Sequence, residues 1–389
     1  MHRLRPGDRR RRRAAVIALP VTRSAHRALA AGFVLLGVVD GAWVARLPAL
    51  KHRLGLDSGR LGLVIFAVSL AATLALPLAG WLSARYGSRG PTGVGLALAA
   101  AALAAAAFAP SFGSLVAVGC VLGAGVGITD VAVNAHGVEL ERRLTRPLLS
   151  PLHAAWSFGL LGGSAVTAVA AAAGVGIRVQ LPAVAAATAA VVAVVVPRLL
   201  SGTASGADIA RFALPRGPLA LPAALMFCAF FVESSAMNWS AVFLSGPAGA
   251  GSAVAAAAVV AYAAAMGFAR LVGDKLMLRW GIGGLARRSG LLSCAGTLLA
   301  ITTRSPAPSL VGFALVGIGC AAIVPALFRF GGSAAGIAAI ASAGYSGGLL
   351  NGPAIGFLAR GVGLSAALGL LVVAGAVIAL FGPRLVSTS

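Results

Sequence analysis

The sequence predicts an all-α polytopic membrane protein with about twelve transmembrane helices in two pseudo-symmetric six-helix bundles. Its composition is the first indication, because 59% of the 389 residues are hydrophobic and only 10% are charged, whereas soluble domains carry about 25% charged residues. Runs of Ala, Leu, Gly and Val of spanning length follow one another, without the alternation of a membrane β-barrel. Finally, Lys and Arg gather in alternate breaks between these runs, as the positive-inside rule describes.

The net charge of +22 at first suggests a nucleic-acid partner. Much of it lies between Arg3 and Arg13, however, and most of the rest lies in alternate loops. No soluble segment is long enough to form a basic face, so we expect no nucleic-acid binding. If the N-terminus is cytoplasmic, most of the 31 Lys and Arg residues fall inside. The outer ones are Arg46, Lys51, Arg53, Arg60, Arg178, Arg304 and Arg360. We therefore expect an integral protein of the cytoplasmic (inner) membrane with both termini cytoplasmic.

Four segments follow from these breaks. Residues 1–25 form a basic cytoplasmic tail, 26–197 the N-terminal six-helix bundle, 198–217 a cytoplasmic linker, and 218–389 the C-terminal bundle with a short tail. The expected helices are 27–48, 60–82, 92–109, 113–136, 150–173, 179–197, 218–245, 252–272, 286–303, 308–328, 334–358 and 363–382.

The two halves resemble each other in sequence. Arg85-Tyr86-Gly87 recurs as Arg279-Trp280-Gly281, and Gly123-Ala124-Gly125 recurs at the same separation as Gly317-Ile318-Gly319. Several matches at one offset indicate a duplicated six-helix unit. Parallel repeats with a central site between them are a plan found in transporters.

Polar residues inside the stretch 123–159 indicate a gate near the cytoplasmic end. Asp130 and Asn134 share a helix face and can bond to the arginines of 142–146 or pair with His153. Polar groups at membrane depth usually face a protein interior or a water-filled path. A loop of solvated charges is the alternative, and Trp156 can equally be an interface anchor. The residues assigned to the cytoplasmic gate are Arg85, Asp130, Asn134, Arg143, His153, Trp156, Asp274 and Arg279.

Two carboxylates lie past the midplane in the first helix of each half. At a rise of about 1.5 Å per residue, Asp40 and Glu233 each sit roughly 20 Å from the cytoplasmic end of their helix. We find no basic residue at matching depth, so we expect both acids to take up and release protons. A permanently protonated structural acid, or one that binds substrate, is the alternative. The residues assigned to the substrate or proton pathway are Asp40, Trp43, Glu233, Asn238 and Trp239.

Other chemistries lack support in the sequence. The four cysteines lie inside apolar runs without paired spacing, which is typical of reduced core residues. The segment GAGVG at 123–127 follows no strand and is not a dinucleotide fingerprint. We find no metal cluster and no Ser/His/Asp constellation, and therefore expect no enzyme, no metal and no cofactor.

The loop after the second helix resembles that of the major facilitator superfamily, G-x-x-x-D-R-x-G-R-R. Gly80, Arg85, Gly87 and Arg89 match this pattern, while Ala84 stands in place of its Asp. In the family this loop helps to lock the cytoplasmic side, and Ala84 removes the carboxylate of that lock. The stretches 41–50, 129–159, 269–281 and 344–359 resemble the fucose-permease-like and rhizopine-transport-like branch.

This resemblance implies a secondary transporter that moves a small polar organic solute, sugar-like and proton-coupled, by alternating access. Efflux of an amphipathic compound is the alternative within transport. Proton antiporters, however, carry an Arg in the fourth helix and a Gly-Pro pair in the fifth, and this chain has neither. A membrane receptor or assembly partner that does not transport is the alternative of another class. The expected partners are the solute, protons and the lipid bilayer, with the chain as a monomer.

Overall fold

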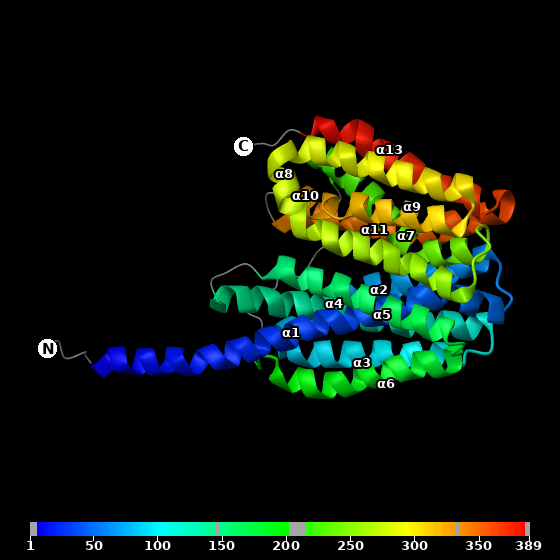
Figure 1. Cartoon of the computed structure of the whole chain (residues 1–389). Coiled ribbons are helices and arrows are strands. Elements are labelled where there is room, and N and C mark those ends of the chain that lie inside the picture. The colour runs from blue at the N-terminus through cyan, green and yellow to red at the C-terminus, as the bar shows by residue number, and fades with distance from the viewer. Residues whose placement is uncertain (1–5, 145–147, 202–214, 332–333, 386–389) are drawn as a thin grey trace.

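The computed structural model describes residues 6–144, 148–201, 215–331 and 334–385, with side chains from Ser24 onward. It is all helical in these ranges (Figure 1). The first bundle contains α1 (Pro6–Arg53), α2 (Ser58–Tyr86), α3 (Arg89–Ala106), α4 (Phe112–Leu144), α5 (Leu149–Ala172) and α6 (Ile177–Val195). The second contains α7 (Ala220–Ser245), α8 (Ser252–Thr303), α9 (Pro306–Cys320), α10 (Ile323–Phe328), α11 (Ala334–Val362), α12 (Leu364–Ala367) and α13 (Gly369–Phe381).

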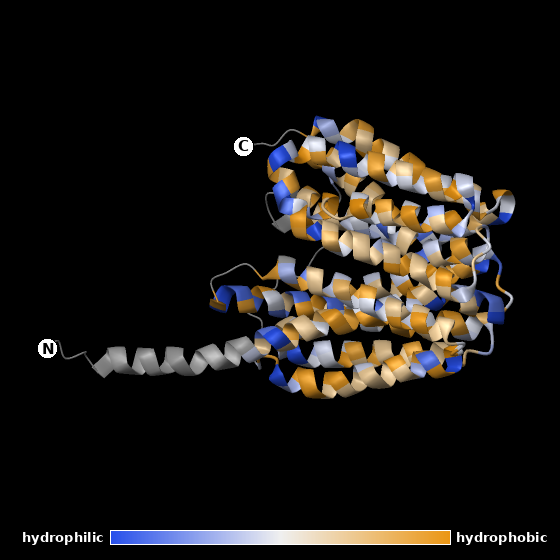
Figure 2. Ribbon diagram, viewed as in Figure 1, coloured by the Kyte–Doolittle hydropathy of each residue, from blue (hydrophilic) through white to orange (hydrophobic). Residues whose placement is uncertain are grey.

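These helices make twelve crossings within the described ranges. Ten helical segments are long and apolar enough to span a membrane. One of the ten, α8, has 52 residues and bends at Gly281, where φ is 65°, so it supplies two crossings instead of one. The 29-residue helix α11 is not among the ten and supplies the twelfth. Hydrophobic residues cover the middle of the helices, and hydrophilic ones gather toward their ends (Figure 2).

Several helices are longer than the hydropathy pattern predicts. The predicted fourth helix ends at 136, but α4 continues to Leu144, so Arg142 and Arg143 lie on its last turn and not in a loop. Likewise α8 continues past 272, which places Asp274 and Arg279 on the helix. The predicted basic tail also lies partly in α1, which begins at Pro6. Polar residues can extend a helix beyond the apolar core because the backbone hydrogen bonds do not depend on lipid. Arg146 and most of the predicted linker lie outside the described residues.

Glycine contacts confirm the duplication of the six-helix unit. A Cβ on Gly123 of α4 would meet the carbonyl of Val68 in α2, and one on Gly317 of α9 would meet that of Tyr262 in α8. The separation in sequence between Gly123 and Gly317 is the same as that between Val68 and Tyr262, so the two contacts occupy equivalent positions in the two halves. These approaches are closer than the 3.0 Å that real Cβ atoms tolerate, so only glycine lets these backbones touch.

The neighbouring glycines repeat the pattern. A Cβ on Gly125 would meet Gly95 and Ala99 of α3, and one on Gly319 would meet Ser289 and Ser293 in the second arm of α8. The residues they meet are again equivalent at the same offset. Gly87 and Gly281, which end the equivalent Arg-aromatic-Gly segments, both have positive φ, 79° and 65°. Sequence repeat and packing repeat therefore coincide.

The two ends of the molecule differ in how the bundles meet. We call the end with Gly87, Leu199 and Gly281 the linker face, and the end with the α1–α2 and α7–α8 turns the opposite face; the chain termini lie at the linker face (Figure 1). Near the opposite face α2 and α11 touch through their backbones, because a Cβ on Gly62 would meet the carbonyl of Gly352. Asp57 and Arg360 form an ion pair of 3.8 Å beside this contact.

Candidate functional site at mid-depth

A cluster of polar side chains lies between the bundles at the middle of the helices. In the first bundle, the indole nitrogen of Trp156 on α5 donates a hydrogen bond to Asp40 Oδ2 on α1, at 3.0 Å. In the second bundle, Arg270 Nη2 on α8 lies 3.3 Å from Glu233 Oε1 on α7. Both side chains of this ion pair are mostly buried, with exposed fractions of 16% and 17%.

Arg270 joins the two halves of this cluster. Its Nη1 donates to Ser157 Oγ on α5 at 2.7 Å, and its guanidinium carbon lies 5.9 Å from the centre of the Trp156 ring. One guanidinium thus contacts a carboxylate of the second bundle and a hydroxyl and an aromatic face of the first. The phenol of Tyr262 donates to the backbone carbonyl of Glu233 at 3.4 Å, which fixes α8 against α7 at this level.

The presence of Arg270 corrects one prediction. The absence of a basic residue at the depth of Glu233 was part of the argument for a proton-titrating acid, and Arg270 shows that this was wrong. The apolar run of α8 begins near Ser252, and Arg270 falls within three residues of the predicted helix end at 272. It therefore resembled an interface residue.

The other predicted pathway residues lie in the protein interior. Trp43 is 4% exposed and Trp239 is fully buried, both in the same large apolar cluster. Asn238 donates from Nδ2 to the carbonyl of Ser234 at 2.9 Å and to Asn351 Oδ1 at 3.5 Å, which links α7 to α11. Asn238 and Trp239 lie closer to the opposite face than Glu233 does, because α7 runs from the linker face to the opposite face.

The predicted gate pair, Asp130 and Asn134, is in contact on α4. Asn134 Nδ2 donates to Asp130 Oδ1 at 3.1 Å, and His153 lies near enough to Asp130 for an electrostatic interaction. His153 itself is exposed and contacts the carbonyl of Leu149 through Nδ1 at 2.8 Å. Of the two predicted partners of Asp130, the structure thus places His153 near it, while Arg143 bonds to Glu139 at 2.7 Å.

The remaining gate residues lie exposed at the linker face. Arg85 stacks on the rings of Trp81 and Tyr86. Asp274 pairs with Arg329 at 2.9 Å, and both side chains are more than half exposed. Arg279 is also exposed. Such surface pairs contribute little to stability, and their role in a gate stays a prediction.

The arrangement can bind a polar solute but lacks the parts of a hydrolytic or metal site. Within the described ranges, no group of three His, Cys, Asp or Glu residues could hold a metal ion. The cluster instead offers two carboxylates, one guanidinium, one hydroxyl and one aromatic face, contributed by both bundles.

Comparison with known proteins decides the family. The model of the Major Facilitator Superfamily matches residues 28–351. The chain belongs to this superfamily. It is a secondary transporter and not an enzyme. An MFS-type transporter of Yersinia pestis is 31% identical over 343 residues, covering 87% of this chain and 89% of the relative. The membrane protein MosC of Rhizobium meliloti is 29% identical over 360 residues, covering 90% and 88%.

Solved structures of other transporters share the fold of this major facilitator at low sequence identity. The D-xylose-proton symporter aligns with a TM-score of 0.74 at 14% identity, covering 92% of this chain and 98% of the other. The fucose:proton symporter FucP of E. coli aligns with a TM-score of 0.64 at 16% identity, covering 93% and 98%. The superfamily fold accounts for the twelve crossings and for the position of the polar cluster between two repeats.

Proposed function

We propose that this transporter moves a small, polar, sugar-like solute across the cytoplasmic membrane by alternating access, coupled to protons. The mid-depth cluster carries the proposal, because Arg270 contacts Ser157 and Trp156 of one bundle and Glu233 of the other. Hydrogen-bonding groups beside an aromatic face suit a hydroxylated ring. The likeness to proton symporters of D-xylose and fucose agrees with this substrate class.

The linker face is cytoplasmic in this proposal. The charge distribution supports it, since only seven Lys and Arg residues lie toward the opposite face and cytoplasmic loops carry the excess of positive charge. The backbone contact between α2 and α11 then closes the extracellular side, so the structure represents a state that faces inward. Residues 26–197 and 218–389 are the two units that rock.

The proton-coupling group is Asp40. Among the described residues no basic group forms an ion pair with Asp40, whose partner is the neutral indole of Trp156. Glu233, in contrast, is paired with Arg270, whose positive charge favours the ionised form of this carboxyl. A carboxylate without a counter-charge at membrane depth is easily protonated, so Asp40 can load a proton on one side and release it on the other.

Transport in membrane vesicles tests the proposal. Uptake of a panel of radiolabelled sugars, cyclitols and amphipathic compounds is measured with and without an imposed proton gradient. We expect a sugar-like solute to accumulate against its gradient only when the proton gradient is present. Accumulation of amphipathic compounds in inverted vesicles instead would establish the efflux alternative and reject uptake.

The Asp40→Asn variant tests the coupling. Asn mimics the protonated acid, so we expect proton-driven accumulation to be lost while solute exchange across the membrane persists. Glu233→Gln leaves Arg270 unpaired, and we expect it to weaken exchange and accumulation together. Wild-type pH dependence of accumulation in Asp40→Asn would show that another group carries the proton.

A further inference from the structure

Helix α7 holds most of the unsatisfied buried polar groups of the described chain. Four of the seven buried side-chain atoms that have no hydrogen-bond partner among the described residues lie on this helix: Glu233 Oε2, Ser235 Oγ, Trp239 Nε1 and Ser240 Oγ. A buried donor or acceptor without a partner costs roughly 1–3 kcal/mol. Such groups are therefore expected to find partners in another state of the transport cycle.

Ser235 and Trp239 form one face of α7. They are four residues apart, so their side chains are neighbours on the helix. Both residues are completely buried, and both the hydroxyl and the indole N–H lack a partner within the described ranges. Neither group is charged. Together they offer a donor, a hydroxyl that can donate or accept, and the apolar face of an indole ring.

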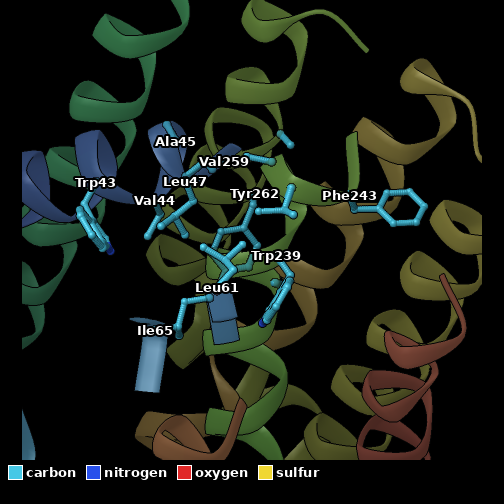
Figure 3. Close-up of a cluster of buried hydrophobic side chains, with 14 of the residues drawn as sticks. Trp43, Val44, Ala45, Leu47, Leu61, Ile65, Trp239, Phe243, Val259 and Tyr262 are labelled. Atoms are coloured by element: carbon cyan, nitrogen blue, oxygen red, sulfur yellow. The ribbon is translucent and has the colours of Figure 1, made fainter. Parts of the chain in front are cut away.

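This face is covered by the other bundle. Leu61 and Ile65 of α2 belong to the same buried cluster as Trp239 and Tyr262, and Figure 3 shows Leu61 beside Trp239. Leu61 and Ile65 lie at the point where α2 and α11 touch. A Cβ on Gly352 of α11 would meet the Gly62 carbonyl and would approach Ile65 Cβ to 3.2 Å. Separation of α2 from α11 at this point would uncover Trp239.

We propose that Ser235 and Trp239 form a solute subsite that opens only when the α2–α11 contact parts, and that it binds a neutral hydroxylated ring. The indole face covers the C–H face of the ring, and a ring hydroxyl accepts from Trp239 Nε1 while a second one bonds to Ser235. Because the face carries no charge, it provides no compensation for an ionic solute. The proposal rests on the transport function proposed above and adds a subsite on the side from which solute enters.

Cysteine labelling from outside the cell tests it. Ser235→Cys is introduced after the four native cysteines are replaced by Ala, and intact cells are treated with a membrane-impermeant maleimide. Gly352→Ala forces α2 and α11 apart, since its Cβ would overlap the Gly62 carbonyl. We expect it to raise the labelling rate about tenfold through a shift in state populations. Gly361→Ala on α11, where a Cβ meets nothing within 4 Å, is the matched control and should leave the rate unchanged.

Protection by solutes tests the ligand class in the same cells. We expect D-xylose, L-fucose or myo-inositol to slow the labelling of Ser235→Cys, and D-glucuronate, a charged ring, to have no effect. Trp239→Phe, which keeps an aromatic ring but removes the N–H, should abolish the protection.

Three results would overturn the proposal: unchanged labelling in Gly352→Ala, no protection by any neutral ring, or equal protection by glucuronate. If Gly352→Ala fails to fold, Gly356→Ala disturbs the same contact, because its Cβ would overlap the Ser58 carbonyl. Ser235→Cys without a glycine substitution should react with the maleimide more slowly, and neutral rings should protect it to the same extent. If a solute is transported but does not change the labelling of Ser235→Cys, the subsite is rejected and the transport function stands. If a solute protects Ser235→Cys from labelling but is not transported, the transport function is rejected.

Discussion

At the scale of the residue, the decisive feature is the position of Arg270 between the bundles. Its guanidinium is mostly buried and contacts Glu233, Ser157 and Trp156. A buried ion pair is not in itself a source of stability, because desolvation of both charges offsets their attraction. Removal of one partner, however, leaves an uncompensated charge in the interior. The intact pair therefore adds little net stability, although each charge depends on the other.

A double-mutant cycle on this pair tests that view. Glu233→Gln and Arg270→Gln each leave one charge unpaired, and we expect each single variant to lose about 3 kcal/mol of stability. The double variant removes both charges and should be more stable than either single one. Thermal unfolding of the purified proteins in one detergent measures the differences. Losses that simply add in the double variant would show that the two charges do not interact.

At the scale of the element, α2 connects the α1–α2 turn at the opposite face to the contact between the bundles. Its N-cap is Asp57, whose Oδ1 accepts from the backbone N–H of Arg60 at 2.8 Å. This hydrogen bond, followed by the charges of Arg360 and Arg60, lowers the pKa of Asp57 below its ordinary value of 3.8. A cap of this kind satisfies one of the free N–H groups at the start of a helix.

Substitution of Asp57 separates the cap from the ion pair. Asp57→Ala removes both and should cost about 1 kcal/mol at neutral pH. Asp57→Asn keeps a side-chain cap and should cost less, because the exposed pair with Arg360 contributes little. Since the folded pKa is lowered, the charged form stabilises above pH 3.8, and this contribution is lost as the pH falls below that value toward the folded pKa. Thermal unfolding of the wild type and of Asp57→Ala at neutral pH and below pH 3.8 checks the sign of this pH dependence. A difference in stability between the two proteins that grows in acid would contradict it.

At the scale of the whole molecule, two repeated bundles form one transporter, and the asymmetry of its positive charges supports the proposed orientation in the membrane. The equivalent glycine contacts in the two halves show that the bundles are built alike, and the α2–α11 backbone contact joins the two bundles near the opposite face. A rocking motion between like halves is the plan that such repeats support.

Labelling of single cysteines checks the orientation. In a background without native cysteines, Ser245→Cys lies exposed at the opposite face and Ser201→Cys lies exposed at the linker face. An impermeant maleimide should label the first from outside intact cells and the second only in inverted vesicles. The reverse pattern would invert the proposed topology.

The sequence by itself determined the fold class, the twelve crossings and the duplication. Hydropathy and charge act residue by residue against the lipid and its surface, so windows of about 20 residues are sufficient to read them. Asp40, Trp156 and Glu233 were identifiable for the same reason, as polar or amphipathic side chains within or beside apolar runs.

Only the tertiary structure decided which of these residues meet. Asp40 bonds to Trp156 across 116 positions of the chain, and Glu233 pairs with Arg270 across 37. Contacts of this kind depend on the rotation and packing of whole helices, which local hydropathy does not specify. The same packing buries the Trp239 indole N–H and the Ser235 hydroxyl without a hydrogen-bond partner among the described residues.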